Sequence, residues 1–146
     1  MSKKLVYVVF FVLVNIGLMS CTSYYIPIDS FKEQFSGIDS TNLRLVIVKG
    51  PAGDMTKYLA NPIDDIKCVD KHNNPMELKN SPSIEIRFTE KDSKRTVFYF
   101  DRVFIIQDSL IVGDMSRFIP RKKVIPINNV RLIEVQDGHK NFKYVE

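Results

Sequence analysis

Short runs of β-branched and aromatic residues, separated by turn residues, are the feature that most restricts what this chain can fold into. In the clearest run, Ser83 to Glu90, the apolar residues Ile84, Ile86 and Phe88 alternate with polar ones. This alternation predicts a strand with one face in a core and the other in water. The longer run from Thr96 to Gln107 is almost continuously apolar, which predicts a strand that is covered on both faces or wrapped into a barrel.

Similar runs recur along the rest of the chain, with turn residues between them. They predict further strands over residues 43–49, 55–60, 65–70, 110–112, 118–127, 130–136 and 141–145. About seven to nine short strands at this spacing indicate one all-β domain, a small sandwich or a partly open barrel. The pattern does not alternate strands with helices, so a parallel α/β sheet is not expected.

One short helix is expected ahead of these strands. Ser30 and Glu33 have the spacing of a capping box, in which the glutamate reaches back to the backbone of the serine. Phe31 and Phe35 lie four residues apart and so share one helical face. We therefore predict a helix over residues 31–36 that docks on the domain through its two phenylalanines.

The first twenty residues have the layout of a secretory signal. Lys3 and Lys4 form a positive tip, and the unbroken apolar run from Leu5 to Val14 follows directly. A membrane-spanning helix is the alternative. An apolar helix of about 15 residues reaches only about 22 Å, short of the hydrocarbon core of about 30 Å. Asn15 also interrupts the run, so a cleaved signal is the better interpretation.

The end of this segment, Leu18-Met19-Ser20-Cys21, resembles the lipobox of bacterial lipoproteins. The resemblance implies that the Cys21 thiol receives a diacylglyceryl group and that the signal is cut between Ser20 and Cys21. The new amino group then becomes a site for a further acyl chain such as palmitate. Two or three chains hold a protein on a bilayer far more firmly than one. The resemblance covers residues 1 to about 22 and leaves the folded domain without a family.

This resemblance also implies a location and a division of the chain. Residues 1–20 would be the removed signal, residues 21–42 a lipid-anchored tether with the short helix, and residues 43–146 the all-β domain. The expected place is the cell envelope: the outer membrane of a Gram-negative cell, or otherwise the outer face of the plasma membrane. Thr22, the residue after the cysteine, is compatible with export to the outer membrane.

Charge and cysteine content exclude some classes of protein. From residue 21 onward, 19 basic residues face 17 acidic ones, whereas nucleic-acid binders show a concentrated excess of lysine and arginine. The extracytoplasmic location also argues against a nucleic-acid partner. With Cys21 modified, Cys68 has no cysteine to pair with, so no disulfide framework is expected.

Cys68, Asp70 and His72 are spaced two residues apart, which would place all three on one face of a continuing strand. Such a face could carry part of a metal site, or a thiol beside a base. The turn residues after His72 suggest that the strand has already ended there. An alternating Ile66–Cys68 pair fits a buried core thiol better. We therefore predict no metal and no cofactor.

Asp101 and Arg102 interrupt the aromatic run that begins at Phe98. A buried carboxylate without a partner is costly, and a perturbed one can be functional. The alternative is a bend or bulge that turns both charges to water or to each other. The second interpretation is favoured, because charged residues at bends of a sheet are common.

A basic segment, Arg117 to Lys123, combines four cations with apolar residues: Arg117, Arg121, Lys122 and Lys123. Beside a membrane such a loop could contact anionic lipid head groups or another envelope polyanion. The alternative is a solvated hairpin in which lysine and proline protect an exposed strand edge.

The sequence lacks the motifs of the common enzyme classes, such as a phosphate-binding glycine loop or a nucleophile elbow. We therefore predict a lipid-anchored, non-catalytic binding or assembly module. Its partner would be another envelope protein, met through a strand edge or an aromatic patch. A barrel that holds an apolar or lipid-like molecule among Phe98, Phe100 and Phe104 is the alternative. An enzyme that uses Cys68 or Asp101 is the third hypothesis.

Overall fold

The computed structural model describes residues 22–145, which form twelve strands in three antiparallel sheets together with one α-helix. The predicted all-β class is confirmed, and the sheets do not close into a barrel. The structure has more strands than the sequence pattern predicted, and all of them are short. The predicted signal, its lipobox and Cys21 lie outside the described residues.

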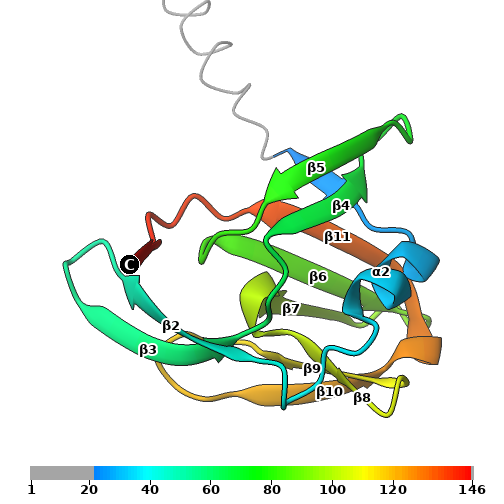
Figure 1. The fold of residues 1–146 in the computed structure, drawn as a ribbon. Coiled ribbons are helices and arrows are strands. Elements are labelled where there is room, and N and C mark those ends of the chain that lie inside the picture. The colour runs from blue at the N-terminus through cyan, green and yellow to red at the C-terminus, as the bar shows by residue number, and fades with distance from the viewer. Residues whose placement is uncertain (1–21, 146) are drawn as a thin grey trace, which may run out of the picture.

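The largest sheet has six strands, and two neighbours within it, β6 and β11, together supply six of the 18 residues of the main apolar cluster (Figure 1). Strand β6 pairs with β11 along almost its whole length, and Ile86 and Phe88 of β6 are buried as the alternation predicted. The order across the sheet is β5 (Pro75–Lys79), β4 (Asp65–Val69), β1 (Ser23–Tyr25), β11 (Val130–Asp137), β6 (Ile84–Glu90) and β7 (Arg95–Tyr99).

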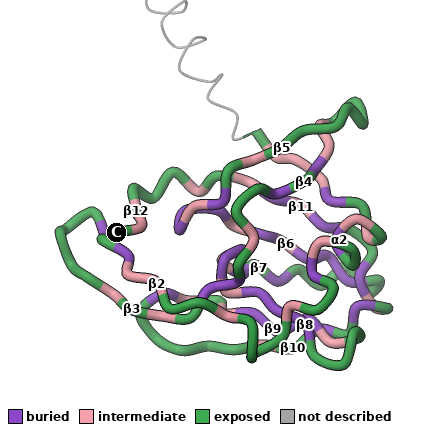
Figure 2. The backbone as a smooth tube through the Cα atoms, viewed as in Figure 1, coloured by how far each residue is buried: buried purple, intermediate pink, exposed green. Residues whose placement is uncertain are grey.

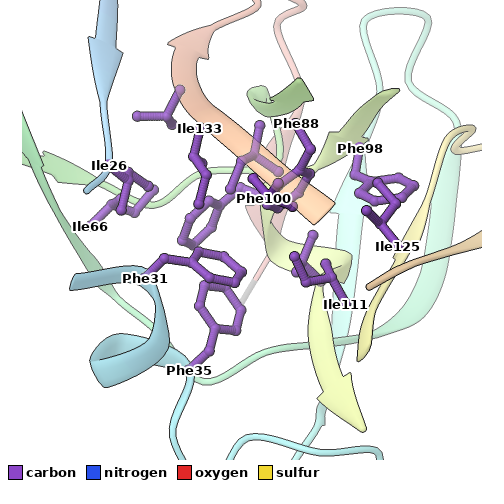
Figure 3. Close-up of a cluster of buried hydrophobic side chains, with 14 of the residues drawn as sticks. Ile26, Phe31, Phe35, Ile66, Phe88, Phe98, Phe100, Ile111, Ile125 and Ile133 are labelled. Carbon is purple, nitrogen blue, oxygen red and sulfur yellow. The ribbon is translucent and has the colours of Figure 1, made fainter. Parts of the chain in front are cut away.

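A second sheet and the helix cover the inner face of the six-stranded sheet. The second sheet consists of β10 (Lys122–Pro126), β9 (Leu110–Asp114) and β8 (Phe104–Ile106), and the helix is α2 (Ile28–Phe35). Phenylalanines from both sides meet between these layers (Figure 3). The Phe31 ring lies 5.4 Å from the Phe88 ring, edge on, and the Phe35 ring lies 5.6 Å from that of Phe100. Such offset aromatic pairs add to the stability that burial alone provides.

The third sheet lies to one side of this core (Figure 1). It consists of β12 (Lys143–Val145), β2 (Arg44–Lys49) and β3 (Met55–Ala60). None of its residues belongs to the main apolar cluster, although Val48 and Ala60 are buried. In Figure 2 its strands are mainly exposed or half-buried, in contrast to the buried middle of the large sheet.

The strand predicted over residues 96–107 is interrupted. The chain runs as β7, then a 3-10 turn η1 (Phe100–Arg102), then β8 in the second sheet. The apolar run therefore serves two layers that face one another. Within β7 it still alternates, with Phe98 buried and Val97 exposed. Strands β1 and β5 were not predicted. Strand β5 is an edge strand with mostly exposed residues, and so lacks an apolar alternation.

The helix begins earlier than the capping box suggested. Pro27 precedes its first turn, and no side chain caps that end. Ser30 lies inside the helix, where its hydroxyl accepts a hydrogen bond from Gln34 at 3.1 Å. Proline is pre-organised for a helix start, and here it takes the place predicted for the serine. The docking role predicted for Phe31 and Phe35 is confirmed, since both are buried.

Most of the segment predicted as a tether belongs to the domain. Strand β1 lies between β4 and β11 in the large sheet, and α2 supplies two core phenylalanines. Within residues 22–145, no helix has the length and apolar character needed to cross a bilayer.

Candidate functional site

Asp101 is a fully buried carboxylate at the place where the third sheet meets the rest of the molecule. The hydroxyl of Tyr144, from β12, donates a hydrogen bond to its Oδ2 at 2.9 Å, and the hydroxyl of Tyr58, from β3, donates to the same oxygen. The Arg117 guanidinium lies 3.7 Å from the other carboxylate oxygen. We call Asp101, Tyr58, Tyr144 and Arg117 the junction cluster.

The strand register explains how two distant tyrosines reach one carboxylate. Tyr58 lies opposite Val46 and Tyr144 lies opposite Val48, on the two sides of β2. Successive side chains of a strand point to opposite faces, and the buried Val48 marks the inward face. Both tyrosines therefore point inward, toward η1.

Asn61 fixes the turn that presents Asp101. Its backbone N–H donates to the Asp101 carbonyl at 2.7 Å. Its side-chain amide donates to the carbonyls of Phe100 at 2.7 Å and Val103 at 3.1 Å. The buried Asn61 thus donates hydrogen bonds to three backbone carbonyls in and next to the 3-10 turn, as buried polar groups require.

Arg117 links the cluster to aromatic rings. Its side chain is only 3% exposed, and its Nη1 donates to the Tyr58 hydroxyl at 2.7 Å. The guanidinium carbon lies 4.0 Å from the centre of the Tyr99 ring and 4.9 Å from that of Phe142. Cation–π contacts of this kind stabilise a cation most where water is excluded.

Burial and the neighbouring Asp101 charge both raise the pKa of Tyr58 and the pKa of Tyr144 above the ordinary tyrosine value. The two phenols therefore keep their protons at neutral pH and act as hydrogen-bond donors to the carboxylate. Hydrogen bonds to the remaining polar atoms help to stabilise a buried ion pair. Both tyrosine hydroxyls bond to Asp101 Oδ2, whereas Asp101 Oδ1 has no hydrogen-bond partner among the described residues. The cluster joins β3, β12, η1 and the β9–β10 connection, and its sealed carboxylate is suited to holding sheets together.

The expectation that Asp101 and Arg102 face water or each other is wrong. The predicted bend exists as η1, but Asp101 pairs with Arg117, while Arg102 lies 3.6 Å from Asp114. The Arg102 guanidinium also lies 3.8 Å from the centre of the Tyr58 ring. Asp101 and Arg102 thus pair with two different residues, Arg117 and Asp114, and neither pairing could be read from the local sequence pattern.

Cys68, Asp70 and His72 do not form a site. Cys68 is buried in the core, and burial raises the pKa of its thiol to about 11, so the thiol is neutral at physiological pH. Asp70 instead organises the β4–β5 turn: it accepts hydrogen bonds from the backbone of His72 at 2.8 Å and of Asn74 at 2.9 Å. Its hydrogen bonds, first that from the Asn74 side chain, lower the pKa of this carboxyl. His72 is exposed.

No metal centre is apparent in the part of the chain that the structure describes. Residues 22–145 contain no group of three or more histidine, cysteine, aspartate or glutamate side chains that could hold an ion.

The four cations of the basic segment do not share one environment in the fold. Arg117 is buried in the junction cluster, whereas Arg121 and Lys122 are exposed. Lys123 is half-buried, bonds to the Thr96 hydroxyl and lies 3.8 Å from Glu90. Phe118, between these cations, is 73% exposed.

Two of the three phenylalanines proposed to line a ligand barrel, Phe98 and Phe100, belong to the packed core. Phe98 packs so closely on β9 that a Cβ at Gly113 would overlap its ring. The third, Phe104, lies beside a surface pocket.

The side of the third sheet that faces away from the domain is unusually apolar. Leu45 is 68% exposed and lies opposite Leu59, which is 52% exposed. We call this surface the outer face; it comprises Leu45, Ile47, Lys49, Met55, Lys57, Leu59, Lys143 and Val145. The sequence pattern predicted β2 and β3 but not this face, because apolar residues on both sides of a strand normally indicate burial on both sides.

Among residues 22–145 the structure thus brings together one ion-paired junction and one apolar face that bears lysines. Comparisons with protein-family models, with curated proteins and with solved structures gave no match to this chain.

Proposed function

We propose that this protein is a lipid-anchored, non-catalytic module of the bacterial cell envelope that binds another envelope protein through the outer face. The observation that carries the proposal is the exposure of Leu45 and Leu59 side by side on a sheet. Contiguous exposed apolar surface is rare on monomeric soluble domains and marks sites of interaction.

Lysines on the same face define the chemistry of the partner. Lys49, Lys57 and Lys143 are exposed and point to the same side as the leucines. Among the described residues of this face none is acidic. A partner surface with an apolar centre and carboxylates around it would complement both features, and charge complementarity would also favour the correct partner over others.

Lipidation of Cys21 would place the outer face close to a membrane surface. Only Thr22 separates Cys21 from β1, which begins at Ser23. Two residues of extended chain span about 7 Å, so lipids on Cys21 would hold the domain directly against the bilayer. Thr22 lies among Leu78, Lys79 and His139, and these residues belong to none of the three strands that carry the outer face.

Site-specific photo-crosslinking in living cells tests the docking proposal. A benzophenone amino acid at Leu59 should form an adduct with one envelope protein, while the same probe at the exposed Met76 of β5 should not. Leu45→Glu should abolish the Leu59 adduct, because it adds a carboxylate to a face that meets carboxylates. Met76→Glu is the matched control and should leave the adduct intact. Adducts with phospholipid alone, or adducts that persist in Leu45→Glu, would contradict a protein partner.

The anchor is tested separately. Cys21→Ala should abolish labelling by radioactive palmitate and leave the signal uncut, because the thiol is the atom that accepts the lipid. Persistence of label on this variant would show that the lipobox interpretation is wrong. Because the crosslinking readout does not depend on labelling, failure of the anchor and failure of the docking face are distinguishable.

A further inference from the structure

A pocket of about 480 Å³ opens between β3, β8 and the β9–β10 connection, beside the junction cluster. It borders the outer face and shares Lys57 and Leu59 with it. Pockets of this size hold small organic ligands.

The walls of the pocket carry more positive than negative charge. Arg102 and Arg117 line it and are paired with Asp114 and Asp101 respectively. Lys57 and Lys122 line it as well, and within residues 22–145 neither has an ion-pair partner. The pocket therefore favours an anion.

The two buried arginines are also incompletely hydrogen-bonded. The side chain of Arg102 is 8% exposed and that of Arg117 is 3% exposed. Nε of each has no hydrogen-bond acceptor among the described residues. Buried donors without acceptors are costly, and a carboxylate or phosphate oxygen is the acceptor that a guanidinium binds best.

Much of the remaining wall is apolar. Leu59, Phe104, Phe118 and Pro120 line the pocket, and the Lys122 ammonium lies 6.0 Å from the centre of the Phe104 ring. An apolar wall next to a cationic one matches a ligand with two chemically different ends.

We propose that this pocket binds a small amphiphile with one anionic head, a carboxylate or a phosphate, and a short apolar body. The head lies toward Arg102 and Lys122, and the apolar body lies against Phe104 and Phe118. This proposal is argued from the lining of the pocket and does not rest on the docking of a partner protein, although the two sites share Lys57 and Leu59.

Titration calorimetry of the purified protein with four soluble probes tests the proposal: hexyl phosphate, hexanoate, hexanol and inorganic phosphate. Hexyl phosphate or hexanoate should bind one site with a dissociation constant of about 1 mM, as expected for a ligand of this size. The tighter of the two identifies the head group. Hexanol and inorganic phosphate should each bind at least about tenfold more weakly, because each lacks one half of the recognition.

A pair of matched double variants locates the site. Lys57→Gln with Lys122→Gln should weaken binding of the charged probe about tenfold, because both exposed cations attract its anionic head. Lys49→Gln with Lys67→Gln removes the same charge from exposed positions outside the pocket and should leave binding unchanged. Equal binding of hexanol or of inorganic phosphate, the same loss in both double variants, or no saturation up to about 10 mM probe would overturn the proposal. Thermal unfolding of each variant verifies its folding.

Discussion

The apolar core and the junction cluster are held together by different forces. The core packs rings and aliphatic side chains from α2, the six-stranded sheet and the second sheet, with the Phe88 and Phe98 rings 5.8 Å apart. The junction instead attaches the third sheet through one carboxylate, two phenols and one guanidinium. Hydrophobic burial is non-directional, whereas the junction works only if each donor meets its acceptor.

This difference has a consequence for stability. Loss of a core ring weakens every layer that it contacts, because the layers share one cluster. Loss of a junction residue leaves an unpaired polar group where the third sheet is attached, so we expect its cost to fall mainly on that sheet. We therefore expect two regions that unfold with different free energies, as local opening in other domains does.

The largest effect is expected from Phe88→Ala. This change removes a fully buried ring that contacts Phe31 and Phe98, and should lower the free energy of unfolding by about 3–5 kcal/mol. Urea denaturation followed by circular dichroism measures it. Val97→Ala, at a partly exposed position on the neighbouring strand, is the control and should cost less than about 1 kcal/mol. A similar loss in the free energy of unfolding for the two variants would show that the apolar core is not the main source of stability.

Arg117→Ala should be somewhat less costly, about 3 kcal/mol, because it leaves the Asp101 carboxylate buried without its cation. Hydrogen exchange should show loss of protection in β2, β3 and β12, and retained protection in β6 and β11. The double variant Asp101→Asn with Arg117→Met removes both charges and should be more stable than Arg117→Ala. If all five strands lose protection together, the two regions form one cooperative unit.

The smallest effect at neutral pH is expected from Tyr144→Phe, which removes one hydrogen bond and should cost about 1 kcal/mol. The contribution of the tyrosines can be recognised by how the free energy of unfolding depends on pH. The pKa of Tyr58 and the pKa of Tyr144 are raised in the folded protein, so the unfolded chain loses these protons first. Stability is therefore retained below about pH 10 and falls as the pH rises above it.

Replacing both tyrosines with phenylalanine should make this alkaline decline less steep. Chemical denaturation at a series of pH values between neutral and strongly alkaline measures the slope. If the free energy of unfolding falls equally steeply with pH in the wild-type protein and in the double variant, the tyrosines are not the cause of the alkaline decline. Phe88→Ala should lower the whole curve without changing its slope, which distinguishes the two regions.

The sequence was most informative where structure depends on neighbouring residues. The alternation in β6 predicted which side chains are buried, and the four-residue spacing of Phe31 and Phe35 predicted a docked helix. It was least informative at the junction. Tyr58 and Tyr144 each lie 43 positions from Asp101, and nothing in their local pattern distinguishes them from other strand tyrosines. The 3-10 turn was predicted only as an unspecified bend.

By itself, then, the sequence determined the all-β class and most of the strands, because each depends on a local pattern of apolar and polar residues. The lipidation of Cys21 rests on a local pattern too and stays a prediction. The tertiary structure decided that Asp101 is buried and paired, that Arg102 has a different partner, and that the leucines of the third sheet are exposed. Alternation shows that a strand has two faces, but which face is covered depends on how separate sheets pack. That packing is set by contacts between residues far apart along the chain.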